Sequence, residues 1–421
     1  MKNLTKTPLY GIINHMNQTT IVRPDYLKLI NSWRDKQIIK VITGVRRSGK
    51  STLLDLFSQQ LLQEGVPLSN LIRLDMEDLA LSHLTSAQQL HTFVTSRLRG
   101  SGPHYLLIDE VQMIHDWQKA IVSLFLRPHL DIYLTGSNAY LLSGELATLI
   151  AGRFVHLEVL PLSFREFMSV PGVDTDAAGS YIRYITDGGF PFVTRLDTRR
   201  NIRDYLQDLY NTIIIKDIVS RQQIRDVPAL ERVAMYLFDN IANLTSIKKI
   251  ADTMTTDGQK ISVTSIDRYI SGLLEAYIFY RADRYDLKGK QYLKTGAKYY
   301  TSDLGWRFHL RGSKLDDEGR ILENIVYLEL RRRGYQVFVG KCDDAEIDFV
   351  ARDGNHQIYI QVCQTTSDPA TLKREITALQ AIPDNYPRFL LTLDRQPDFN
   401  FAGIRQVNVL DWLQVDQNFP L

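Results

Sequence analysis

The chain has 421 residues, of which 44% are hydrophobic and 23% are charged. These values are ordinary for globular proteins and exclude the disordered and fibrous classes. One hydrophobic core seldom serves more than about 300 residues, so we expect roughly two to four domains. The formal net charge of +2 indicates no particular partner, because a nearly neutral chain can still carry a strongly basic face.

The compartment is inferred from cysteine usage and hydropathy. The only cysteines are Cys342 and Cys363, too few for a disulfide framework or a four-cysteine zinc site, which is typical of a reducing compartment. Residues 1–17 lack the apolar run of a signal peptide, and no stretch reaches the roughly 18 apolar residues of a membrane span. We therefore expect a cytoplasmic protein without membrane contact.

Short β-branched runs alternate with helical stretches between residues 37 and 161. The strand-like runs cover residues 38–42, 71–74, 105–108, 132–134 and 155–159. Strands that alternate with helices predict a parallel sheet covered by helices on both faces. We expect residues 1–160 to form this α/β domain.

The rest of the chain divides into three predicted parts. Residues 161–228 lose the strand pattern and carry apolar residues at helical spacing, which indicates a helical lid. Residues 229–310 contain three helical segments followed by two strand-like runs, a pattern typical of a winged helix-turn-helix. Residues 311–421 begin with a helix and continue through strand-like runs, which predicts a second, smaller α/β domain.

A glycine-rich phosphate-binding motif follows the first predicted strand. Residues 44–51 match G-x-x-x-x-G-K-[ST] and lead into the helix-like residues 52–64, which is the context the motif requires. Backbone N–H groups of such a P-loop point at phosphate oxygens, and the helix N-terminus adds partial positive charge. We expect Lys50 to reach the β- and γ-phosphates of ATP and Ser51 to bind Mg²⁺. The nucleotide would contact Gly44, Val45, Arg46, Arg47, Ser48, Gly49, Lys50, Ser51 and Thr52.

Two carboxylates end the third predicted strand. The apolar residues 105–108 lead into Asp109 and Glu110, which places both acids at the carboxyl edge of the sheet, where open α/β sheets bind ligands. Asp109 is predicted to hold magnesium through water, and Glu110 to polarise the attacking water. For either motif alone, the alternative is a structural turn or a strand that ends in solvated acids. The two motifs together predict a P-loop ATPase.

Two further positions are candidates for catalysis. Ser137 and Asn138 follow the next strand, so a hydroxyl or an amide would help to place the water beside Glu110; an ordinary Gly-Ser-Asn turn is the alternative. Arg153 precedes the last core strand. It either reaches a γ-phosphate on a neighbouring subunit, which requires a homo-oligomer, or is a plain surface arginine.

These motifs together resemble a family of prokaryotic AAA-type (AAA+ superfamily) ATPases with a C-terminal restriction-endonuclease-like domain of unknown function (domain of unknown function 4143). The resemblance implies that Asn138 is a sensor residue, that Arg153 is a trans-acting arginine finger, and that residues 21–27 lie near the nucleotide base. It rests on the P-loop with its paired arginines, Asp109-Glu110-Val111-Gln112, Trp117, Thr135-Gly136-Ser137-Asn138, Gly152-Arg153, Gly188-Gly189-Phe190-Pro191 and Glu346-Ile347-Asp348-Phe349-Val350.

The resemblance also implies a nuclease-like group of residues near the C-terminus. Domains of this type use a helix acid, a strand aspartate, and a glutamate or glutamine two residues before a lysine, because metal ions and water must converge on one phosphodiester. Glu323, Asp348 and Gln361 take the first three places, but Cys363 stands at the lysine position. A thiol cannot supply the fixed positive charge of lysine. We therefore expect a vestigial site without nuclease activity; merely solvated acids are the alternative.

Basic residues gather on the predicted wing, interleaved with tyrosines: Arg281, Arg284, Lys288, Lys290, Lys294 and Lys298. Such a hairpin would lie along the phosphates of duplex or branched DNA while residues 262–269 enter a groove. Charge runs also belong to solvated faces, and winged helices also contact proteins. The sequence thus leaves three hypotheses: an ATPase that associates with or remodels DNA, a signalling or scaffold ATPase with a protein partner, and an ATP-gated nuclease.

Overall fold

The computed structural model of the chain describes residues 20–100, 102–139, 152–173, 176–256, 258, 261–312, 317–395 and 399–415. Contacts divide the chain into two compact units. The first unit consists of Met1–Val159 and Ser169–Gly172, and the second of Leu160–Met168 and Val173–Leu421. In the described part of the chain, every helix is too short or too polar to cross a membrane.

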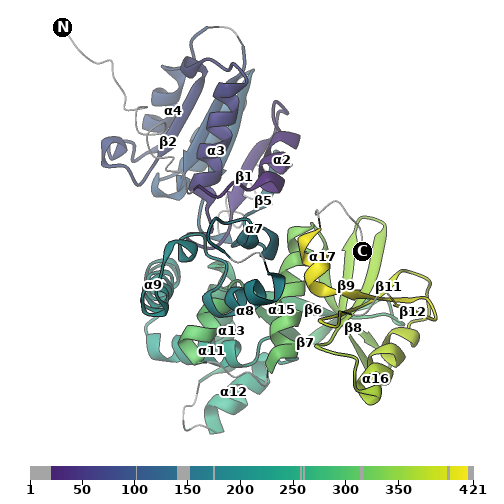
Figure 1. The fold of residues 1–421 in the computed structure, drawn as a ribbon. Helices are drawn as coiled ribbons and strands as arrows, with labels where there is room; N and C mark the ends of the chain where they lie inside the picture. The colour runs from purple at the N-terminus through teal and green to yellow at the C-terminus, as the bar shows by residue number, and fades with distance from the viewer. Residues whose placement is uncertain are drawn as a thin grey trace, which may run out of the picture. The chain divides into compact units, whose positions relative to one another are not determined.

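The first unit contains a five-stranded sheet in the order β2-β3-β4-β1-β5 (Figure 1). Neighbouring strands are parallel throughout, which confirms the predicted α/β class. Strand β4 lies between β1 and β3, so the carboxyl ends of these three strands lie side by side. The strands are β1 (Ile39–Thr43), β2 (Leu71–Asp75), β3 (His104–Asp109), β4 (Leu130–Thr135) and β5 (Phe154–Glu158).

Helices cover both faces of this sheet. Alternate side chains of a strand point to opposite faces, so Ile39 and Val41 pack in one core, and Ile42 packs in the other. Burial on both faces explains the nearly continuous apolar strands. One core contains α4 (Ala87–Thr95) and α5 (Trp117–Phe125), and the other contains α2 (Pro24–Ser32) and α3 (Lys50–Gln63). Short 3-10 turns are η1 (Leu68–Asn70), η2 (Leu79–Leu81) and η3 (Val111–Met113).

The second unit begins with helices, in agreement with the helical spacing of residues 161–228 and with the three helical segments after them. The first group is α7 (Phe164–Met168), α8 (Ala177–Asp187), η5 (Val193–Arg195), α9 (Arg199–Thr212), the π-helical η6 (Ile213–Val219) and α10 (Ser220–Gln222). The three segments are α11 (Val227–Asp239), α12 (Ile247–Thr256) and α13 (Val263–Glu275).

An eight-stranded sheet in the order β12-β13-β11-β10-β9-β8-β6-β7 completes the second unit (Figure 1). Helix α15 contacts β7, β8, β9 and β10, whereas α16 contacts β9, β10 and β11. The elements are β6 (Phe279–Asp286), β7 (Gln291–Thr301), α14 (Leu304–Arg311), α15 (Glu318–Arg332), β8 (Gln336–Cys342), β9 (Ala345–Asp353), β10 (His356–Val362), α16 (Pro369–Gln380), β11 (Arg388–Thr392), β12 (Phe399–Phe401), β13 (Ile404–Asn408) and α17 (Val409–Gln414).

The hairpin β6–β7 differs from the wing that the sequence predicted. Strand β6 pairs in parallel with β8, with Arg284 opposite Val339. Tyr285 of β6 is buried in the same hydrophobic core as Cys342 and Ile347. The sheet therefore continues through the border that we expected at residue 310, and the hairpin belongs to one body with the C-terminal strands.

Candidate active site

The P-loop joins β1 to α3 in the first unit. Gly44 has a φ of 144°, and a Cβ there would lie 2.1 Å from the carbonyl oxygen of Val159, so no side chain fits. Gly49 caps α3 in the left-handed conformation, with a φ of 101°. The buried Lys50 donates hydrogen bonds from Nζ to the carbonyl oxygens of Gly44, at 2.9 Å, and Val45, at 3.1 Å. The loop therefore holds the ammonium group against its own backbone.

The two predicted carboxylates end β3, and a threonine from β4 connects them. The hydroxyl of Thr135 donates to Asp109 and accepts a hydrogen bond from the backbone N–H of Glu110 at 3.1 Å. The side chain of Ser51 also hydrogen-bonds Asp109. Because β4 lies between β1 and β3, the predicted residues Ser51, Asp109 and Glu110 meet at one edge of the sheet.

An arginine that the sequence did not reveal lies beside Asp109. Arg73 of β2 is buried and pairs with Asp109 at 3.2 Å and with Asp55 of α3 at 3.1 Å. Burial alone would raise the pKa of Asp109, but the charge of Arg73 and two hydroxyl hydrogen bonds outweigh it and hold this pKa below its ordinary value. Asp109 is therefore ionised at neutral pH.

Glu110 has the surroundings of a general base. Its backbone adopts a left-handed conformation with a φ of 52°, and its carboxylate accepts hydrogen bonds from Gln112 and, at 3.4 Å, from the Ser137 hydroxyl. Burial raises the pKa of Glu110, and the charge of Lys50 only partly opposes this shift. A carboxylate with a raised pKa accepts a proton more readily from water near neutral pH.

The other predicted nucleotide contacts have different surroundings. Arg47 and Thr52 are exposed, whereas Arg46 pairs with Glu77 at 3.4 Å. Asn138, the predicted sensor, is buried with an exposed fraction of 1%.

Ser48 of the P-loop has a contact with the segment before the first strand. Its carbonyl oxygen accepts a 3.0 Å hydrogen bond from Arg23, which is buried and stacks on Tyr26. Residues 21–27 therefore touch the P-loop itself, while their contact with a nucleotide base stays a prediction.

Arg153 lies at the amino ends of the strands, whereas the P-loop lies at their carboxyl ends. It is exposed just before β5, and its carbonyl oxygen accepts the N–H of Ile39, the first residue of β1. The P-loop follows the last residue of β1, and five strand residues span about 17 Å. The guanidinium group lies near Phe125, with 5.9 Å between Cζ and the ring centre. Arg153 is therefore placed away from the P-loop of its own chain.

The donor atoms at the P-loop suit Mg²⁺ and a nucleotide. Magnesium prefers oxygen ligands, and the Ser51 hydroxyl and the Asp109 carboxylate lie in contact. The Lys50 ammonium group adds the positive charge that phosphates require.

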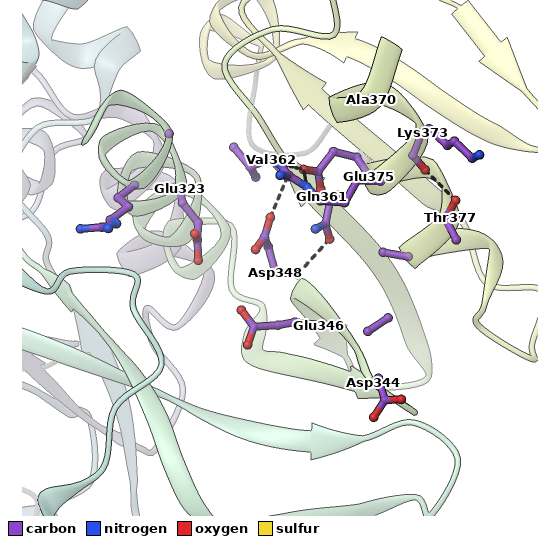
Figure 2. Close-up of a pocket in the computed structure, with 15 residues that line it drawn as sticks. Glu323, Asp344, Glu346, Asp348, Gln361, Val362, Ala370, Lys373, Glu375 and Thr377 are labelled. Carbon is purple, nitrogen blue, oxygen red and sulfur yellow. Dashed lines mark hydrogen bonds and ion pairs between the residues drawn. The ribbon is translucent and has the colours of Figure 1, made fainter. Parts of the chain in front are cut away.

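The nuclease-like residues of the second unit line a pocket of about 920 Å³. Figure 2 shows Glu323 on one side of this pocket and Asp348 with Gln361 on the strands across from it. The backbone N–H of Asp348 donates to the Gln361 amide oxygen at 3.1 Å, and the N–H of Val362 donates to Asp348 at 3.0 Å. The structure thus brings together three residues that the resemblance implied. We refer to this space as the acidic pocket.

Two expectations about this region need correction. Lys298, expected to contact DNA, is buried with an exposed fraction of 3% and pairs with the carboxylates of Glu323, Glu346 and Asp348. A buried lysine of this kind cannot contact a DNA backbone. Burial raises the pKa of the Cys363 thiol to about 12, so this side chain is neutral. Cys363 thus supplies no positive charge, as we expected. The correction is that Lys298 of β7 places a positive charge beside Glu323 and Asp348 instead.

The other predicted DNA contacts divide into three groups. Arg281 and Lys288 are exposed but pair with neighbouring aspartates. Arg284 is half-buried, and Lys290 is exposed in the turn of the hairpin. The side chain of Lys294 lies outside the described part of the structure.

Comparison with known proteins gives the family. Residues 36–168 match the family model "AAA domain", and residues 178–317 match "Domain of unknown function (DUF8612)". An uncharacterized protein of Haemophilus influenzae is 38% identical over 402 residues, which are 94% of this chain and 100% of that protein. An uncharacterized protein of Methanocaldococcus jannaschii is 32% identical over 361 residues, 82% of this chain and 79% of that protein.

Solved structures give weaker likenesses. The Walker-type ATPase of Pyrococcus abyssi has a TM-score of 0.41 and 18% identity, and the match covers 69% of this chain and 96% of that one. The Aeropyrum pernix ORC1 protein in complex with DNA has a TM-score of 0.34 and 12% identity, with 76% and 97% covered.

The matched ranges agree with the geometry of the first unit and refine the expectation for the second. The AAA model covers the parallel sheet, the P-loop and the two carboxylates. The model of the domain of unknown function DUF8612 covers residues 178–317, from α8 to the residue before α15. It ends near the start of the restriction-endonuclease-like domain that we expected over residues 311–421, so that domain stays a prediction. The chain belongs to the same family as the Haemophilus influenzae protein, and its N-terminal part is an AAA-type ATPase domain.

Proposed function

We propose that this protein is a magnesium-dependent ATPase that uses ATP binding and hydrolysis to control association with DNA. The observation that carries the ATPase part is that Ser51 and Thr135 both hydrogen-bond Asp109, while the Thr135 hydroxyl also accepts the N–H of Glu110. These groups lie beside the P-loop lysine at the carboxyl edge of the sheet, where α/β proteins bind ligands.

Each side chain has a defined task in this proposal. Lys50 leaves the carbonyl oxygens of the loop and binds the β- and γ-phosphates. Bound magnesium supplies charge neutralisation at the transferred phosphate. Ser51 and Asp109 hold that ion, and Arg73 keeps Asp109 ionised. Glu110 takes the proton of the attacking water. Hydrogen bonds from Gln112 and Ser137 orient the Glu110 carboxylate.

Two variants test the ATPase proposal. Lys50→Ala should lose ATP binding, because the phosphates lose their cation. Glu110→Gln should bind ATP with unchanged affinity but turn it over about 100-fold more slowly, because a general base contributes about that factor. Lys28→Ala, which removes an exposed lysine of α2, should behave as wild type. Unchanged turnover in a folded Glu110→Gln protein would contradict the assigned role.

The DNA part of the proposal is supported by the second unit. Helices α11, α12 and α13 followed by the hairpin β6–β7 have the element order of a winged helix-turn-helix. Lys288 and Lys290 are exposed at the end of this hairpin. We expect salt-dependent binding of duplex or branched DNA that is lost when Lys288, Lys290 and Lys294 are changed to Glu. Absence of binding at about 50 mM salt, where phosphate contacts are strong, would exclude it.

A protein partner is the second candidate, and a specific observation favours it. Arg281 and Lys288 are already paired with aspartates, and Lys298 is buried, so the hairpin carries less free charge than the sequence predicted. If ATP controls such a partner, Glu110→Gln protein should retain it in the presence of ATP and release it without ATP. Lys50→Ala protein should not retain it under either condition. ATP turnover measured with and without several DNA forms decides between the two candidates.

A further inference from the structure

A buried cation of the protein lies against three carboxylates that line the acidic pocket. Lys298 enters from β7, and its Nζ lies 2.9 Å from a carboxylate oxygen of Glu323, 2.9 Å from Glu346 and 3.2 Å from Asp348. The lysine side chain has an exposed fraction of 4%. Helix α15 supplies the first carboxylate and β9 the other two. One ammonium group therefore contacts carboxylates from two elements that follow it in the chain.

Oxygen atoms of Glu323, Asp348 and Gln361 already accept hydrogen bonds within the protein. Oε1 of Glu323 accepts one from the Tyr300 hydroxyl at 2.7 Å, in addition to the bond from the ammonium group. Oδ2 of Asp348 accepts the N–H of Val362, and the amide oxygen of Gln361 accepts the N–H of Asp348. Among the described residues, no three His, Cys, Asp or Glu side chains are grouped to hold a metal. The residues therefore do not fit a divalent ion.

The charges of this cluster also balance without a metal. Burial lowers the pKa of Lys298, but its three carboxylate partners outweigh this effect and raise the pKa, so the ammonium group stays charged. Burial raises the pKa of Glu323 to about 8, although Lys298 opposes the shift. Glu323 therefore takes up a proton at a higher pH than an ordinary glutamate, which reduces the negative charge that Lys298 must balance. Glu346 is partly exposed, and water screens its charge.

We propose that Lys298 is a tethered cation that occupies the place of a divalent metal in the acidic pocket, so that this pocket is metal-free in the working protein. Position 363 has a cysteine where a nuclease would have a lysine. Lys298 of β7 provides a positive charge beside Glu323 and Asp348, but it acts as a structural counter-ion for these carboxylates. Its ion pairs connect the segment that matches the domain of unknown function to α15 and β9. Lys298 serves this role whether or not the protein binds DNA.

Counting bound Mn²⁺ tests the proposal in the full-length protein. All proteins carry Ser51→Ala and are free of nucleotide, so that the P-loop contributes no ion. Electron paramagnetic resonance of free Mn²⁺ should give the same number of bound ions with and without the further change Asp348→Asn or Glu323→Gln. If the parent protein binds one ion more than either folded variant, the proposal is wrong.

Removal of the lysine gives the complementary result. Lys298→Met should bind one additional Mn²⁺, because three carboxylates lose their cation, and adding Asp348→Asn should abolish this gain. Lys373→Met is the matched control, since Lys373 lines the same pocket, whereas the cation that pairs with Glu323, Glu346 and Asp348 is Lys298. A folded Lys298→Met protein without the additional ion contradicts the proposal. If this variant does not fold, the comparison of the parent with Asp348→Asn and Glu323→Gln still decides.

Discussion

Arg73 and Lys298 solve the same physical problem in the two units. Each is buried, and each pairs with carboxylates from other elements of its own unit. A buried carboxylate without a partner would take up a proton or destabilise the fold, because its charge loses hydration. In the first unit the pairing leaves Asp109 ionised and beside Ser51. In the second unit it places a positive charge beside carboxylates that line the acidic pocket.

Arg73→Gln should therefore impair both the stability and the activity of the ATPase domain. Removal of one member of a buried ion pair costs about 3 kcal/mol of unfolding free energy, measurable by urea denaturation. We expect ATP turnover to fall about tenfold, a loss of about 1.4 kcal/mol in transition-state stabilisation, with a higher half-saturating Mg²⁺ concentration. Lys50 is untouched, so ATP binding should persist.

Two controls separate the role of Arg73 from a general loss of arginine. Arg73→Lys keeps the charge and should recover part of the Mg²⁺ dependence. Arg99→Gln changes an exposed arginine of the same unit and should match wild type. Wild-type Mg²⁺ dependence in a folded Arg73→Gln protein would show that Arg73 does not position Asp109.

At the scale of elements, one carboxylate organises the turn after α8 and the start of α14. Asp303 is buried and accepts the backbone N–H groups of Gly189 at 2.6 Å and Gly305 at 2.9 Å. Gly188 has a φ of 88°, and a Cβ there would lie 2.1 Å from Oδ1 of Asp303. The Gly188–Pro191 motif, which is part of the family resemblance, therefore has a packing role in this structure.

Gly188→Ala and Gly312→Ala form a matched pair that tests this role. Both glycines have positive φ, but nothing lies within 4 Å of a Cβ on Gly312. Gly312→Ala should cost about 1–3 kcal/mol from the backbone alone, because a φ of 77° with a ψ of 165° is a conformation that essentially only glycine adopts. Gly188→Ala should cost about 1–3 kcal/mol more, because the methyl group also displaces the Asp303 carboxylate. Equal costs in urea denaturation would show that the contact with Asp303 is unimportant.

The elements also show what a sequence can and cannot predict. The P-loop and the Asp109-Glu110 pair are contiguous motifs with strong local geometry, so the nucleotide edge was predictable. Arg73 and Asp109 are 36 residues apart, and an isolated arginine in a strand gives no local sign of its partner. Lys298 was misassigned because a run of basic residues does not reveal which side chains point inward.

At the scale of the whole molecule, the second unit is more continuous than the sequence suggested. Periodicity identified helices α11–α13 and the hairpin, but it could not show that β6 pairs with β8. Strand pairing depends on residues far apart in the chain, which local patterns do not encode. The predicted wing and the C-terminal strands therefore share one sheet, and a partner bound at the hairpin would contact the same body that contains the acidic pocket.

If Arg153 is an arginine finger, it must act on the P-loop of another subunit, and from this hypothesis we predict that ATP turnover needs more than one subunit. Arg153 is exposed at the amino end of β5, and the P-loop follows the carboxyl end of β1. The γ-phosphate of a nucleotide bound to the same chain would therefore lie at the other end of the strands. Arg153→Ala and Lys50→Ala should each be nearly inactive alone. In an equal mixture, a repeating head-to-tail interface would pair an intact Lys50 with an intact Arg153 at about a quarter of the sites, restoring about that fraction of wild-type turnover.

Arg127→Ala is the matched control for this mixing experiment, since Arg127 is an exposed arginine just beyond α5 in the same unit. Arg127→Ala alone should keep wild-type turnover, because it removes surface charge but leaves the proposed arginine finger Arg153 in place. An arginine finger contributes at least about 1000-fold to turnover, so recovery in the mixture of Arg153→Ala with Lys50→Ala should stand far above both parents. Full activity of Arg153→Ala alone, or a mixture that stays inactive although affinity capture of one tagged variant also recovers the other, would assign Arg153 to the surface and catalysis to a single chain.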